Sequence, residues 1–170
     1  MQISKDIQTG DLLTFQGKDK NYKALLCTST YRFKSPFYFT FAVLTYDQLQ
    51  KPSKNDLLEC NFFGTTNTKD GYFKYSEKEL EKMWFHHPEI KPYCLGSYGL
   101  LVWRKDFLEF HDNFERIDTI NIITNLDKNG NGSINGSSWE FLTDFFNEKY
   151  RPFLYNRGQK PFSIKSILQN

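Results

Sequence analysis

The chain has 170 residues and a formal net charge of +2, and its aromatic content is high, with 17 Phe, 10 Tyr and 3 Trp. These values exclude a disordered chain, because disorder accompanies few aromatic residues and strong net charge. They also argue against a dedicated nucleic-acid-binding protein, which normally carries a large basic excess. The only alanines are Ala24 and Ala42, which disfavours long helices and coiled coils. The length predicts one domain over residues 1–170, with Asp70 the best place for a subdivision.

Composition and cysteine spacing predict the origin and compartment of the protein. Phe, Tyr, Asn, Ile and Lys are plentiful, and all have A/T-rich codons, which suggests a low-GC bacterium or a phage. The N-terminal residues contain no apolar run of signal-peptide length, and no segment is apolar enough for a membrane span. Cys27, Cys60 and Cys94 are widely spaced and form no C-x-x-C pair. We therefore expect a cytoplasmic protein with reduced cysteines.

The first part of the chain is typical of β-structure. Strands are predicted at Leu12–Phe15 and Tyr22–Thr30, joined by the polar turn Gly17–Asn21. A third strand, Phe37–Tyr46, is rich in β-branched and aromatic residues and apolar enough for burial on both faces. A loop at Lys51–Asp56 and a strand at Leu57–Phe63 follow. This spacing predicts a bent antiparallel sheet or an SH3-like partial barrel.

The second half of the chain mixes helices and strands, so the expected fold class is α+β. Ser76 and Glu79 match a capping box at the start of a helix that ends near Phe85. Strands are predicted at Leu100–Trp103 and Ile117–Ile123. Helices are predicted at Lys105–Glu115, from Trp139 to Phe146 with Arg151-Pro152 ending it, and at the Pro161–Asn170 tail.

The most distinctive local pattern is the loop that begins at Asp127. It resembles EF-hand and dockerin calcium loops, whose oxygen ligands at positions one, three and five would here be Asp127, Asn129 and Asn131. Position twelve holds Ser138 instead of the bidentate glutamate, so calcium binding would be weak. Alternatively, the Asn-Gly pairs are turn chemistry that leads into a helix capped by Ser137 or Ser138.

The sequence contains no decisive catalytic motif, and we expect no enzyme activity. There is no P-loop, no G-x-S-x-G elbow and no dinucleotide fingerprint. His86, His87, Cys94 and His111 are the residues that could gather around a metal, although their spacing does not require it. His111 is more readily explained as an exposed or core-edge histidine. Apart from weak calcium binding, no cofactor is implied.

Aromatic and basic residues alternate in Tyr22-Lys23, Tyr31–Lys34 and Phe73–Tyr75. Surfaces that bind single strands combine these residue types, because aromatic rings stack bases and Lys follows phosphates. A nucleic-acid-associated accessory protein is therefore the alternative function, and a hydrolase is a distant third. Aromatic residues on a β-sheet face are, however, more often part of the core.

The segments Thr9–Phe15, Tyr22–Cys27, Phe37–Tyr46 and Gly96–Trp103 carry a resemblance to a known family. Together they resemble small bacterial immunity proteins of polymorphic-toxin systems, in particular the immunity protein 26 group, mainly over residues 1–60. The resemblance implies a bent antiparallel sheet and a cytoplasmic protein that blocks one cognate toxin. It supplies no catalytic residues.

Protein binding is thus the leading function, with occlusion of the partner as its mechanism. Aromatic anchors at interfaces lie beside polar loops, and four residues near predicted loops or element ends meet this condition. They are Tyr31, Phe33, Trp84 and Tyr93. Packing at the edge of the core is the alternative for each of them.

Overall fold

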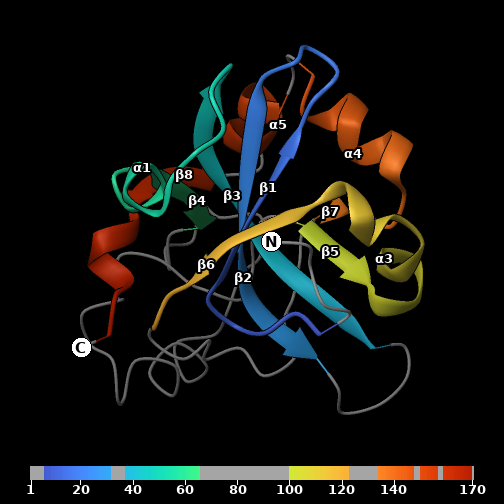
Figure 1. The fold of residues 1–170 in the computed structure, drawn as a ribbon, viewed down its shortest axis with the longest axis horizontal. Coiled ribbons are helices and arrows are strands. Elements are labelled where there is room, and N and C mark those ends of the chain that lie inside the picture. Colours follow the sequence, from blue (N-terminus) through green and yellow to red (C-terminus); the bar gives the residue numbers. More distant parts are fainter. Residues whose placement is uncertain are drawn as a thin grey trace.

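The computed structural model describes residues 6–31, 37–65, 100–122, 134–147, 150–156 and 159–169, and these form an α+β fold around an open sheet (Figure 1). The strands are β1 (Asp11–Gln16), β2 (Tyr22–Tyr31), β3 (Tyr38–Gln48), β4 (Asn61–Thr65), β5 (Leu100–Trp103), β6 (Glu115–Thr119), β7 (Ile134–Asn135) and β8 (Gln159–Ser163). The α-helices of the described part are α1 (Lys54–Leu58), α3 (Arg104–Phe110), α4 (Trp139–Phe145) and α5 (Tyr150–Asn156). The described part also contains two short 3-10 helices, η2 (His111–Asn113) and η3 (Ile164–Ile167).

The sheet is built on a central meander of β1, β2 and β3. Its strand order is β6-β1-β2-β3-β4-β8, and β5 pairs with β3 and with the short parallel strand β7. The β2–β3 register shifts between Lys23 and Leu25 and again between Cys27 and Ser29. Such bulges bend a strand and increase its local twist.

Both faces of the meander are buried, because alternate residues of each strand face different clusters. The larger cluster includes Phe15, Phe41 and Phe107 and lies toward α3, α4 and α5. The smaller one includes both alanines, Ala24 and Ala42, and lies toward α1, β4 and η3. In Figure 1, α3 and α4 lie to one side of the meander, and α1 and β4 lie to the other. The predicted two-sided burial of the third strand is confirmed, since β3 is buried throughout residues 39–44.

The Gly10-Asp11 motif has a structural role at the junction of β1 and β6. Gly10 has φ +94°, and an added Cβ would lie 2.0 Å from the carbonyl oxygen of Ile120. The buried Asp11 carboxylate accepts hydrogen bonds from Thr119 Oγ1 at 2.6 Å and Gln8 N at 3.0 Å, and pairs with Arg116 Nη2 at 2.9 Å. The motif therefore fixes the entry of the chain into the sheet.

The predicted loop at Lys51–Asp56 and strand at Leu57–Phe63 are wrong in their bounds. Residues 54–58 form helix α1, and β4 begins only at Asn61. The reason is a capping box in which Ser53 accepts from the backbone N–H of Asp56, whose carboxylate accepts from the Ser53 N–H at 2.8 Å. Asp56 here takes the position that Glu or Gln occupies in the usual capping box.

Several C-terminal boundaries also differ from prediction. Pro152 does not end the helical region but lies in the first turn of α5, where a missing N–H costs no hydrogen bond. The tail forms strand β8 and then the turn η3 instead of a single helix. Helix α3 ends at Phe110, and Phe114 remains buried beyond η2. The helix predicted at 76–85 lies outside the described residues.

No helix in the described ranges is both long and apolar enough to cross a membrane.

Candidate partner-binding site

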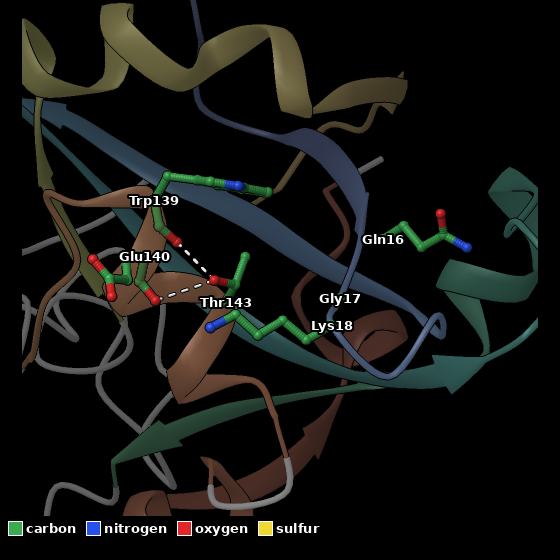
Figure 2. A pocket seen from close by; sticks show the side chains of 6 residues that line it. All are labelled: Gln16, Gly17, Lys18, Trp139, Glu140 and Thr143. Atoms are coloured by element: carbon green, nitrogen blue, oxygen red, sulfur yellow. Dashed lines mark hydrogen bonds between the residues drawn. The ribbon is translucent and has the colours of Figure 1, made fainter.

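A groove separates the β1–β2 turn from helix α4 (Figure 2). Its volume is about 360 Å³, and its walls are Gln16, Gly17, Lys18, Trp139, Glu140 and Thr143. We call it the Trp139 groove. Because its two walls are far apart in sequence, only the folded chain brings them together, and the sequence patterns contained no signal for it.

The turn side of the groove is held by its own backbone hydrogen bonds. Gly17 N donates to Asn21 O at 2.8 Å, and Lys20 N donates to Gly17 O at 3.0 Å. The Asp19 carboxylate accepts from Asn21 N at 3.1 Å, an Asx-type contact that stabilises tight turns. Lys18 is thereby presented toward α4 (Figure 2), where its ammonium group pairs with Asp144.

The helix side of the groove is positioned by a cap and by aromatic packing. Ser138, one of the two caps predicted from the sequence, accepts from Phe141 N at 3.2 Å and so starts α4. The Trp139 indole packs edge-to-face on Phe15 and Phe114, each with ring centroids 5.5 Å apart. Trp139 is therefore a fixed wall that is half-buried in the larger cluster.

The polar groups of the groove differ in how they are satisfied. The Thr143 hydroxyl donates to the carbonyl oxygens of Trp139 and Glu140, each at 3.1 Å (Figure 2). Lys18 is neutralised by Asp144. The exposed Glu140 carboxylate has no ion-pair partner within the described ranges. The groove thus carries one uncompensated negative charge beside an aromatic wall.

Beside the groove, helices α4 and α5 expose aromatic side chains. Phe141 and Phe145 stack at 6.0 Å with an interplanar angle of 15°, and Phe153 meets Phe145 edge-on at 5.7 Å. We call these three residues the aromatic trio. Phe145 is buried, whereas Phe141 is 41% exposed and Phe153 is 37% exposed. The helical pattern predicted burial for Phe145 but gave no signal for the exposed pair.

A second hollow, of about 400 Å³, lies between the end of β3 and α1. Tyr46 donates its hydroxyl hydrogen to Gln50 O at 2.8 Å, and Cys60 Sγ donates to Asp56 O at 3.3 Å. Burial raises the pKa of the Cys60 thiol, and the charges of Asp56 and Glu59 add to this. Cys60 is consequently a poor thiolate and not an activated nucleophile.

The described part of the chain does not test the sequence-predicted partner residues. Phe33, Trp84 and Tyr93 lie outside the described residues. Tyr31 ends β2, where it pairs with Tyr38 in the register, and its side chain is likewise outside the description. Their role stays a prediction.

The candidate metal ligands are also mostly outside the described residues, namely Asp127, Asn129, Asn131, His86, His87 and Cys94. His111 is half-buried at the end of α3, and its Nδ1 lies 2.8 Å from Leu108 O. This agrees with its interpretation as a core-edge histidine. Within the described ranges, no three His, Cys, Asp or Glu side chains gather as a metal site.

Lys23, which the sequence offered as a phosphate contact, is turned into the protein. Its side chain is only 1% exposed, and its ammonium group lies 2.7 Å from Asp19 Oδ2 and 2.5 Å from Asp47 Oδ1. A lysine in this position is not accessible to a nucleic-acid backbone. The Tyr22-Lys23 pair therefore lends no support to single-strand binding.

Comparisons with protein-family models, with curated proteins and with solved structures give no match to this chain.

Proposed function

We propose that this protein is a non-enzymatic, cytoplasmic protein-binding module that neutralises a cognate bacterial toxin by occlusion, as an immunity protein does. The observation that carries the proposal is the aromatic trio, which leaves Phe141 and Phe153 exposed on the outer side of α4 and α5. Large aromatic side chains at a surface mark interaction sites, because water solvates them poorly and a partner surface removes them from it.

The surroundings of the trio suit an interface of ordinary composition. Glu140 and Asp144 are exposed on the same helix, and Arg151 is exposed on α5. Protein interfaces combine an aromatic centre with a polar rim of this kind, and a few aromatic anchors carry most of the binding free energy. Tyr31, Phe33, Trp84 and Tyr93 are further proposed contacts.

The proposal extends to the fold type and to the loop at Asp127. We assign the bent β1–β2–β3 meander to the SH3-like partial-barrel type, which is supported by its bulges and by burial on both faces. The loop with Asp127, Asn129 and Asn131 is proposed as a weak calcium site at most, and a rise in melting temperature with calcium, removed by Asp127→Ala, would test it.

Co-expression with the product of the adjacent gene tests the proposed function. We expect rescue of growth and a stable one-to-one complex in size-exclusion chromatography with light scattering. Phe141→Asp should weaken the complex by about thirtyfold or more, as for an interface hot spot. The matched control is Leu49→Asp, which alters an apolar residue that is even more exposed, at 74%, in the loop after β3.

Two outcomes would overturn the proposal. One is the absence of both rescue and complex with the neighbouring gene product. The other is a Phe141→Asp variant that is folded by circular dichroism and binds as tightly as the Leu49→Asp control.

A further inference from the structure

The Trp139 groove is lined by the Trp139 indole and by the exposed residue Glu140, whose carboxylate points away from the indole in Figure 2. Phe15 and Phe114 pack edge-to-face with the Trp139 ring, and Phe110 lies 6.1 Å from it at 33°. In Figure 2 the indole plane lies along one wall, with Thr143 and Lys18 across the groove from it. The core aromatic residues therefore hold the indole ring in place on one side, and its other side borders the groove.

The charges of the groove favour a cation. The ammonium group of Lys18 is already paired with Asp144, one turn along α4 from Glu140. Glu140 is exposed and has no ion-pair partner in the part of the chain that the structure describes, so its side chain is free to turn toward the groove. A carboxylate that has no ion-pair partner among the described residues can neutralise a group of another molecule.

A cation over an indole face and beside a carboxylate is a favourable arrangement. The negative face of the ring attracts the cation, and the carboxylate accepts charge-assisted hydrogen bonds from it. Guanidinium suits such a site better than ammonium, because it is planar, stacks on aromatic rings and is less strongly hydrated.

The groove and the aromatic trio share helix α4, which carries both Trp139 and Phe141, on different sides of the helix axis. We propose that the Trp139 groove receives an arginine side chain of the partner protein, with its guanidinium group on the Trp139 face and paired with Glu140. This inference rests on the proposed function, and it adds that the partner carries an arginine as well as the apolar residues that cover the trio.

Titration of the ¹⁵N-labelled protein with L-argininamide tests the site without any partner. The readout is the indole Nε1–H signal of Trp139, assigned with the Trp139→Phe variant. We expect a saturable shift of this signal with argininamide and none with citrullinamide, an analogue of nearly the same shape whose side chain is uncharged. Glu140→Gln should weaken binding by about three- to fivefold, the size expected for an exposed ion pair.

The matched control is Glu109→Gln, which removes an exposed carboxylate on α3. It should bind argininamide as the unaltered protein does. A shift that does not saturate, that citrullinamide reproduces, or that is equal in Glu140→Gln and Glu109→Gln would overturn the inference.

Failure of this inference is distinguishable from failure of the proposed function. If the neighbouring toxin is neutralised in a Phe141-dependent manner but argininamide gives no saturable shift, only the arginine site is wrong. If argininamide binds through Glu140 but no toxin is neutralised, the groove recognises guanidinium and the proposed function is wrong.

Discussion

At the scale of single residues, Lys23 shows how this protein keeps a charge inside its sheet. Its ammonium group bridges Asp19 in the β1–β2 turn and Asp47 on β3, and Asn21 Nδ2 donates to the same Asp47 oxygen at 2.8 Å. Burial alone would lower the pKa of Lys23, but the hydrogen bonds to the two aspartates outweigh burial and raise it above 10.5. Through the Lys23 side chain, the cluster links the ends of β1, β2 and β3.

Replacement of Lys23 by Met keeps most of the side-chain volume and removes the charge. The two aspartates then lose their cation, and we expect the free energy of unfolding to fall by about 2–3 kcal/mol, which is less than for a fully buried pair. The reason for the smaller loss is that each aspartate is 28% exposed. Urea denaturation measures the change. Lys18→Met, at the exposed pair with Asp144, should cost less than about 1 kcal/mol, and equal losses would contradict the prediction.

Asp47 makes part of this stability dependent on pH. Burial would raise the pKa of its carboxyl group, but the hydrogen bonds from Lys23 and Asn21 lower it below 3.8. Because the pKa of Asp47 is lower in the folded than in the unfolded state, its ionised form stabilises the protein at pH values above the unfolded-state pKa. This stabilisation is lost as the pH falls through the folded-state pKa. The stability difference between the unaltered protein and Asp47→Asn should therefore be largest near neutral pH and shrink below pH 3.8. A difference that is constant with pH would count against this cluster.

At the scale of elements, the β1–β6 junction depends on a backbone that only glycine adopts easily. Gly10 N donates to Cys27 O on β2 at 2.8 Å, and Gly10 O accepts from Ile120 N just beyond β6 at 2.9 Å. The positive φ of Gly10 is what allows both contacts, because its carbonyl and N–H then face different strands. One residue thus links three strands.

Substitution of Gly10 by Ala should destabilise the protein by more than about 2 kcal/mol, through the positive φ and the contact with the Ile120 carbonyl. Thermal unfolding followed by circular dichroism measures this. The control is Gly17→Ala, which has no positive φ and whose added Cβ would meet side-chain atoms of Asp19 at 2.9 Å and Lys23 at 3.2 Å, not a carbonyl group at 2.0 Å. A melting temperature that falls no more for Gly10→Ala than for this control would show that the junction adapts.

At the scale of the whole molecule, one sheet serves two cores. The aromatic residues fill the larger cluster, where Phe15, Phe107 and Phe146 make edge-to-face and tilted contacts with their neighbours. The smaller cluster is built mainly from aliphatic residues and Phe62. Much of the aromatic content of the described residues is therefore core, whereas five aromatic residues are exposed, namely Phe37, Trp103, Phe141, Phe153 and Tyr155.

The thiol of Cys27 reports on the opening of this core. It is fully buried in the larger cluster, and burial together with the nearby charge of Asp11 raises its pKa well above the ordinary value. Alkylation of Cys27 should require global unfolding and be at least about a thousandfold slower than in denaturant. Mass spectrometry of the peptides measures it, with the half-buried Cys60 as the internal comparison. Rapid native alkylation of Cys27 would show that the core opens locally.

Elements whose signals are local could be predicted from the sequence. The hairpin around Gly17–Asn21, the strand at Leu100–Trp103 and the Ser138-capped helix depend on turn chemistry, apolar runs and caps within a few residues. Helix α1 was missed because its box uses Asp56, and α5 because Pro152 is tolerated in a first turn. These errors concern the interpretation of local rules and not long-range packing.

The sequence by itself determined the α+β class, the two-sided burial of the third strand and the turn that carries Lys18. Only the tertiary structure decided that Lys23 faces Asp47, that Gly10 meets Ile120 and that the turn lies against α4 to form the Trp139 groove. The physical reason is that hydrogen-bonded turns and hydrophobic periodicity act between residues near in sequence. Ion pairs and grooves join segments that are distant in sequence, and their partners are chosen by strand register and core packing.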